Sequence, residues 1–194
     1  IFDIRLPRII AAVLIGSSLA ISGASFQAMF VNPLVSPGIL GVLSGASFGA
    51  ALGMVMGWSW FFINLSTFIF GLIAVLFALL ISFIYSSAKN MIILVLGGII
   101  SSSLFSALLS IVKYAADPYD AVPAITYWLM GSLAFSTPNV VWNLSIPLVL
   151  GMIILIFLSK YLNALSLGDE EAKALGVDTK KIKIIVILTA TFLS

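Results

Sequence analysis

The 194-residue sequence contains no cysteine and no histidine. The first absence excludes disulfides and thiolate chemistry, and the second removes imidazole acid–base catalysis and a common zinc ligand. Only 8% of the residues are charged, whereas soluble globular proteins carry about 25%. Hydrophobic residues make up 62% of the chain. The sequence therefore has few groups for chemistry in water and indicates a lipid environment.

Long apolar runs follow one another along the chain, each of roughly twenty residues and long enough to cross a ~30 Å hydrocarbon core. We expect an all-α, polytopic transmembrane helical bundle with about six spans in this sequence. The expected spans are residues 6–30, 39–57, 60–85, 91–115 and 140–158, with a sixth beginning near residue 182. The shorter apolar segment 122–135 is expected to be a partial or re-entrant helix.

Helix breaks and rows of small residues indicate how these spans are organised. Asn32-Pro33 and Pro37-Gly38 are expected to end the first helix and delay the second. Two rows with a spacing of four residues allow close approach of neighbouring backbones, so we predict helix packing along both. They are Ala12, Gly16, Ala20, Ala24 and Ala28, and Gly41, Gly45, Gly49, Gly53 and Gly57.

Several classes of activity lack the residues that they need. No Asp, Glu, Lys or Arg lies well inside an expected span, which argues against a carrier coupled to protons or ions. Serines are frequent, but no general base accompanies them, as an intramembrane hydrolase would require. There is no phosphate-binding loop, so this chain is not expected to hydrolyse ATP. Nor is there a basic face for nucleic acid. We expect no catalytic site, no metal and no cofactor in this chain.

Charge is concentrated near the C-terminal end: nine of the sixteen charged residues lie between Lys160 and Lys183. Alternating loops place six of the nine basic residues on the side of this segment, and the excess predicts that this side is cytoplasmic. Arg5 and Arg8 then lie on the outer side. The six are Lys89, Lys160, Lys173, Lys180, Lys181 and Lys183.

A short helix is predicted inside this charged loop. Ser166 and Asp169 resemble a capping box, and Gly176 is a natural helix terminator. Lys173 can pair with Glu170 one turn earlier. Leu167, Ala172 and Leu175 can form a narrow apolar stripe. Because about nine residues make a marginal helix in water, a partner that packs on it is one explanation. A solvated loop between two spans is the other.

At this point the chain resembles the FecCD-type permease subunits of iron–siderophore, haem and vitamin B12 ABC importers, a type II importer family. The residues that carry the resemblance, in family order, are Arg5-Leu-Pro-Arg8, the series Gly23, Gln27, Asn32-Pro33-Leu34, Pro37-Gly38 and Leu40-Gly41, then Tyr127-Trp128-Leu-Met-Gly131, and Leu167-Gly-Asp-Glu-Glu-Ala-Lys-Ala-Leu-Gly-Val177. The resemblance covers the whole chain. It implies about ten helices in the full protein, with the first before Ile1 and the last three to four after Ser194.

The resemblance also implies partners and site residues. Such permeases pair as homo- or heterodimers, two ATPase subunits holding ATP and Mg²⁺ dock on the cytoplasmic loop, and an extracytoplasmic substrate-binding protein docks outside. The implied ATPase-coupling residues are Leu167, Gly168, Asp169, Glu170, Ala172, Leu175 and Gly176. The implied docking residues are Arg5 and Arg8, for which interfacial snorkelling is the alternative. Asn32, Leu34 and Met91 are implied at the inner gate, and Gly97 and Ser101 on the pathway, with a helix break and helix packing as alternatives.

The prediction is a single, partial permease domain over residues 1–194, with a cytoplasmic coupling loop at 160–183. It would serve a binding-protein-dependent importer that moves an iron–siderophore, or haem or cobalamin, across the cytoplasmic membrane of a bacterium. ATP would be hydrolysed by separate subunits. Two alternatives stay open: an ion-coupled secondary transporter or channel with its polar residues elsewhere in the full protein, and a non-transporting membrane scaffold.

Overall fold

The structure is a computed structural model that describes residues 4–85, 91–134 and 136–194, with only the backbone of Met91. Lys89, which entered the charge comparison, and the side chain of Met91, implied at the inner gate, lie outside the described residues. The chain divides into two compact units. Unit 1 combines Ile1–Pro37 with Ser132–Ser194, and unit 2 is Gly38–Gly131.

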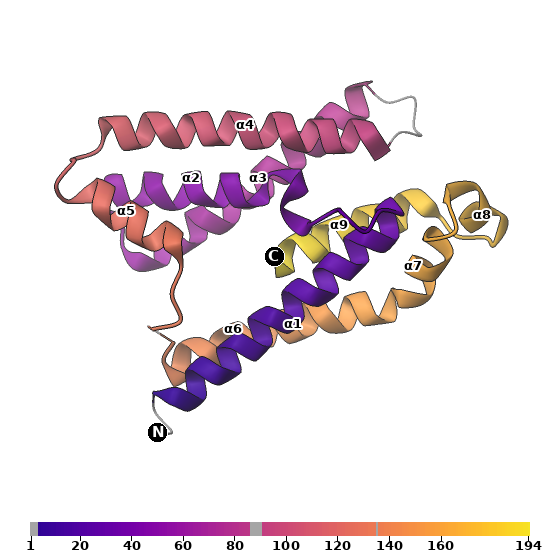
Figure 1. Ribbon diagram of the computed structural model, residues 1–194, viewed down its shortest axis with the longest axis horizontal. Coiled ribbons are helices and arrows are strands. Elements are labelled where there is room, and N and C mark those ends of the chain that lie inside the picture. The colour runs from indigo at the N-terminus through magenta and orange to yellow at the C-terminus, as the bar shows by residue number, and fades with distance from the viewer. Residues whose placement is uncertain (1–3, 86–90, 135) are drawn as a thin grey trace. The chain divides into compact units, whose positions relative to one another are not determined.

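Both units are helical, and the described residues contain no β-strand (Figure 1). This confirms the all-α prediction. The helices of unit 1 are α1 (Arg5–Phe30), α6 (Pro138–Phe157), α7 (Ser159–Leu165), α8 (Asp169–Ala174) and α9 (Thr179–Leu193). Those of unit 2 are α2 (Val42–Val55), α3 (Trp60–Tyr85), α4 (Met91–Ala115) and α5 (Ala121–Met130), and the 3₁₀ turn η1 (Pro37–Leu40) precedes them in the chain.

In the part of the chain that the structure describes, four helices are long and apolar enough to cross a membrane, namely α1, α3, α4 and α6. All four coincide with predicted spans to within two residues at each end. The second predicted span is shorter than expected, because η1 and Gly41, with φ of 85°, occupy its start. The remaining α2 has 14 residues, or about 21 Å at 1.5 Å per residue. The expected partial helix is α5, with 10 residues.

In unit 2, α2 lies directly against α3 along the glycine row. A Cβ built on Gly49 would lie 2.5 Å from the carbonyl oxygen of Ser66. The Ser66 hydroxyl in turn donates a hydrogen bond to the Gly49 carbonyl at 2.9 Å. Gly45 and Gly53 are likewise buried against α3. The prediction that this row mediates helix packing is confirmed for Gly45, Gly49 and Gly53.

In unit 1, α1 packs against α6 and α9 through a different face from the one predicted. Ser22 is fully buried, and its hydroxyl donates to the Ala190 carbonyl of α9 at 2.7 Å. Phe26 and Met29 are buried on the same helix. The small residues Ala12, Gly16, Ala20 and Ala24 are exposed instead. For these four residues the predicted helix packing is wrong within the described chain, because the serine and aromatic face fits α6 and α9.

Candidate coupling surface and outer-face arginines

The charged loop folds into the short helices α7 and α8 before α9 begins. Gly168 precedes α8 with φ of 118°, a conformation that residues with a Cβ rarely adopt. The predicted capping box is wrong, because Ser166 still closes the preceding α7. Its hydroxyl donates to the Asn163 carbonyl at 2.8 Å instead of reaching α8. The first turn of α8 carries the acidic cluster Asp169, Glu170 and Glu171, as predicted.

The end of α8 is a Schellman motif centred on Gly176, which has φ of 80°. The Val177 amide donates to the Ala172 carbonyl at 3.0 Å, and the Gly176 amide donates to the Lys173 carbonyl at 2.9 Å. Gly176 therefore ends the helix as predicted, although α8 has six residues where about nine were expected. The reversal sends the chain within a few residues into α9.

The predicted apolar stripe on this helix is split by the fold. Ala172 is fully buried, and α8 contacts both α7 and α9. Leu167 and Leu175 are each 65% exposed, and Glu170 and Gly176 are exposed beside them. We call Leu167, Glu170, Leu175 and Gly176 the coupling surface, a name taken from the role that the resemblance implies for this loop. Ala172 anchors this surface to unit 1 and does not belong to it.

Among the described residues, three ion pairs order the loop. Lys173 pairs with Glu170 at 3.4 Å, as predicted. Lys183 Nζ on α9 lies 2.6 Å from Asp169 Oδ2 on α8, a contact that the pattern did not reveal. The third pair joins Lys181 and Asp178 at 3.2 Å. The sequence offers one indication of the Lys183–Asp169 pair. Lys183 lies between two isoleucines, and a charged side chain in apolar surroundings needs a partner.

The start of α9 is capped by Asp178, whose carboxylate accepts the Lys181 amide at 3.2 Å. This hydrogen bond, followed by the one from the Lys181 side chain, lowers the pKa of Asp178 below its ordinary value of 3.8. A lowered folded-state pKa means that the ionised form favours folding. The contribution is present above the unfolded value and is lost as the pH falls through the folded value.

We expect the amide of Lys181 to lose protection when the pH is lowered from about 5 to about 2, because Asp178 then becomes protonated. Hydrogen exchange, corrected for the intrinsic rate at each pH, measures this. Asp178→Asn is the matched control, since it keeps an acceptor oxygen and has no charge to titrate. Equal protection at both pH values in the unmodified protein would contradict the assignment of this cap.

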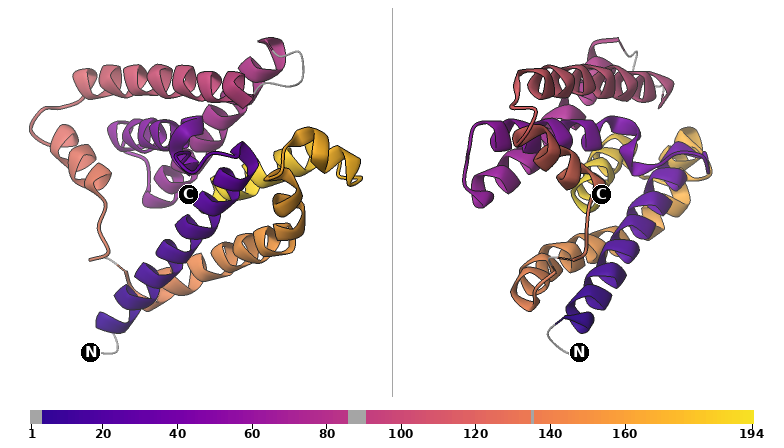
Figure 2. Two further views of the ribbon diagram at one scale, coloured as in Figure 1. Left: turned by 45° about the vertical axis from the view of Figure 1, so that its right-hand side comes forward. Right: turned by 60° about the vertical axis from the view of Figure 1, so that its left-hand side comes forward.

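Arg5 and Arg8 lie in the first turn of α1, at the opposite end of unit 1 from α8 (Figures 1 and 2). Both arginines are exposed. Arg8 Nη2 donates to the Ala134 carbonyl at 2.9 Å, which ties the start of α1 to the segment before α6. This partner was not predicted. The separation of the two charged sets agrees with their predicted location on opposite sides of a membrane.

The residues implied at the gate and pathway fall into two groups. In unit 1, the Asn32 carboxamide oxygen accepts the Leu34 amide at 2.9 Å, and Leu34 is 90% exposed just after α1. In unit 2, Ser101 is fully buried and its hydroxyl donates to the Ala74 carbonyl of α3 at 2.7 Å. A Cβ on Gly97 would lie 2.7 Å from the Ala78 carbonyl oxygen of α3. Helix packing therefore accounts for Gly97 and Ser101 in this structure.

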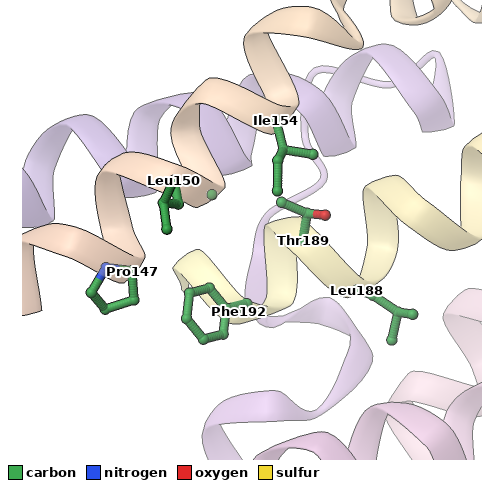
Figure 3. A pocket seen from close by; sticks show the side chains of 7 residues that line it. Pro147, Leu150, Ile154, Leu188, Thr189 and Phe192 are labelled. Carbon is green, nitrogen blue, oxygen red and sulfur yellow. The ribbon is translucent and has the colours of Figure 1, made fainter.

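An open groove of about 340 Å³ lies between α6 and α9 of unit 1 (Figure 3). Thr189 supplies the one hydroxyl of its lining, and none of the lining residues is charged. Pro147, Leu150, Gly151 and Ile154 come from α6, and Leu188, Thr189 and Phe192 from α9. Such a lining suits an apolar neighbour and has nothing to orient a charged solute.

Comparison with known proteins is consistent with this arrangement. The chain is 42% identical over 187 residues to the molybdate import system permease protein MolB of Haemophilus influenzae, covering 96% of this chain and 55% of that protein. It is 32% identical over 205 residues to the iron(3+)-hydroxamate import system permease protein FhuG of Bacillus subtilis, covering 100% and 60%. It is 35% identical over 208 residues to the hemin transport system permease protein HmuU of Yersinia pestis, covering 98% and 58%.

The chain thus spans between half and two thirds of the length of these relatives. A solved structure described as an inward-facing conformation of a metal-chelate type ABC transporter superposes with a TM-score of 0.90 at 41% identity, covering 100% of this chain and 62% of that chain. The family model for the FecCD transport family matches residues 1–194. The four apolar helices, the motifs and these matches lead to one conclusion: the chain belongs to the FecCD transport family.

Proposed function

We propose that the protein is the membrane permease subunit of a binding-protein-dependent ABC importer. The observation that carries this proposal is the coupling surface, a set of exposed residues on and directly beside the short helix α8, which the buried Ala172 anchors to unit 1. Family membership supports it, since the matched relatives are named as import permeases. Residues 1–194 would form part of one permease domain in a cytoplasmic membrane.

The proposed mechanism assigns energy conversion to separate subunits. An ATPase subunit would receive the coupling surface, and closure on ATP and Mg²⁺ would move α8. The permease would bind no cofactor and catalyse no reaction itself, which agrees with the absence of a phosphate-binding loop from the sequence. A dimer of permease subunits would enclose the pathway, and the two ends of unit 1 would face the two partners.

The cargo is proposed to be a metal chelate of the iron–siderophore class. The names of the relatives also include hemin and vitamin B12, and the relative with 42% identity is a molybdate permease, which adds an oxyanion to the cargo classes. Uptake by vesicles holding the whole importer, measured with ferric hydroxamate, hemin, cyanocobalamin and molybdate in parallel, distinguishes them. Uptake of molybdate alone would overturn the chelate assignment.

The experiment that tests the function is purification of the tagged full-length protein from its native membranes in mild detergent. Mass spectrometry of the co-purifying chains should find an ATPase with a phosphate-binding loop in near-equal amount. Absence of such an ATPase, with the permease still folded and monodisperse, would overturn the proposal. An ion-coupled carrier or a scaffold would then account better for the chain.

The outer-face role of the arginines gives a separate prediction. We expect Arg5→Glu to slow association with the substrate-binding protein by on the order of tenfold at low salt and to flatten the salt dependence, because exposed interfacial charges steer encounter. Surface plasmon resonance over a salt series measures both. Arg5→Lys is the matched control, since it keeps the charge. Arg5 is preferred to Arg8, whose replacement would also remove the hydrogen bond to Ala134. An unchanged salt slope would contradict docking through Arg5.

A further inference from the structure

We propose that the Asp169–Lys183 ion pair is a positioning contact that transmits movement of α8 to α9 and from there to α1. The proposal rests on the function proposed above and assigns a role within that machinery. It differs from the implication that Asp169 contacts the ATPase directly. Three features of unit 1 support it, and each concerns a different part of the connection.

The first feature is that α8 is too short to hold itself. A helix of six residues is unstable alone in water, so its position depends on tertiary contacts. Ala172 supplies the apolar contact, and the salt bridge supplies the polar one. With exposed fractions of 18% for the Lys183 side chain and 39% for that of Asp169, this pair is shielded from solvent more than the local Lys173–Glu170 and Lys181–Asp178 pairs. Shielding strengthens the electrostatic attraction and fixes its geometry.

The second feature is that the pair joins two helices. Asp169 begins α8 and Lys183 lies in the second turn of α9, fourteen residues later in the chain. The Lys173 and Lys181 pairs link positions three residues apart, within one turn of the chain. Displacement of α8 therefore acts on α9 through the 2.6 Å contact between Lys183 Nζ and Asp169 Oδ2.

The third feature continues the connection beyond α9. Ala190 lies seven residues after Lys183, or about two helical turns, on roughly the same side of α9. Its carbonyl accepts the hydroxyl of Ser22 on α1 at 2.7 Å, in a fully buried contact. Hydrogen bonds between apolar helices keep such neighbours in register. Movement that reaches α9 is thus passed to the middle of α1.

Substitution of Lys183 tests the transmission of movement without changing the docking surface. Asp169 lies beside the coupling surface, so its replacement would disturb both. The Lys183 side chain is 18% exposed and engaged by Asp169, and it is not part of the coupling surface. Lys183→Met keeps an unbranched side chain of similar length and removes only the charge. Lys180→Met is the matched control, because Lys180 is an exposed residue on the same helix.

The experiment uses the full-length permease with its ATPase in nanodiscs and measures ATP hydrolysis with and without the substrate-binding protein, with no cargo added. For Lys183→Met we expect unchanged ATPase co-purification and basal hydrolysis, because the buried Ala172 still anchors α8 and no residue of the coupling surface is changed. Stimulation by the binding protein should fall about fivefold or more, the lower range of a typical coupling energy. Lys180→Met should behave as the unmodified protein. The exchange Asp169→Lys with Lys183→Asp should show more stimulation than Asp169→Lys alone, because both variants carry the same change beside the coupling surface and only the exchange restores an ion pair between α8 and α9.

Two results would overturn the proposal. One is full stimulation in Lys183→Met, which would show that the pair transmits nothing. The other is loss of ATPase co-purification in Lys183→Met, which would limit the pair to holding the docking surface. If the unmodified protein binds no ATPase, the proposed function itself fails, and this result is distinguishable from both.

Discussion

Replacing Leu167 and Leu175 together by aspartate is expected to abolish co-purification of the proposed ATPase partner while leaving the protein folded in the membrane. Both side chains are 65% exposed, so the change removes no internal contact of comparable size. Burying a leucine at an interface contributes about 1.5–3 kcal/mol. The loss of two such contacts, about 3–6 kcal/mol, corresponds to at least a hundredfold weaker affinity.

The measurement is the molar ratio of ATPase to permease after purification, with size-exclusion chromatography to confirm a monodisperse permease. Asn163→Asp is the control, because it adds a negative charge at an exposed position on the neighbouring α7. It should leave the ratio unchanged. If the double aspartate variant still co-purifies with the ATPase at the original ratio, the coupling surface is not the docking site. Membership of the family would not alter that conclusion.

Replacing Gly49 by leucine is expected to disrupt unit 2. The Cβ alone would lie 2.5 Å from the Ser66 carbonyl oxygen and 2.9 Å from its carbon, and both are backbone atoms of α3. Backbone cannot move aside as a side-chain tip can, so α2 must separate from α3. Overpacking by a few atoms costs about 1–3 kcal/mol in a packed interior, and a whole leucine side chain demands a larger displacement. The Ser66 hydrogen bond to Gly49 would be lost as well.

The fraction of permease that stays monodisperse after heating in detergent should drop sharply for Gly49→Leu and measurably for Gly49→Ala. Gly16→Ala is the matched control, since among the described residues its added Cβ would meet no heavy atom within 4 Å apart from its chain neighbours and the adjacent backbone of α1, on the exposed side of that helix. It should be neutral or stabilising by up to about 1 kcal/mol through helix propensity. Equal heat resistance of Gly49→Leu and the unmodified protein would refute the close contact of α2 and α3.

Composition and short-range sequence patterns were sufficient to predict the positions of the helices that could span a membrane. Apolar length located α1, α3, α4 and α6, and Asn32-Pro33 marked the end of α1. The length of the apolar run could not show that η1 and the positive φ of Gly41 shorten α2. A 3₁₀ turn and the first turn of an α-helix can have the same apolar composition. The position of the charged loop was also evident, since charge in so apolar a chain is expected outside the bilayer.

The two rows of small residues show where sequence reasoning stops. Both have a spacing of four, yet Gly45 and Gly49 are buried against α3, whereas Ala12 and Gly16 are exposed. A spacing defines a smooth helix face but carries no information about which neighbour covers it. The same limit applies to Ser101, which the pattern allowed on a pathway and the fold directs to the Ala74 carbonyl.

The sequence by itself determined the helical class, the apolar spans, the acidic start of α8 and its end at Gly176, because each depends on residues close together in the chain. Only the tertiary structure decided that Lys183 pairs with Asp169, that Ser22 bonds to Ala190 and that Arg8 holds Ala134. These contacts join residues 14, 168 and 126 positions apart. Their geometry follows from how whole helices pack, and no local pattern of residues specifies it.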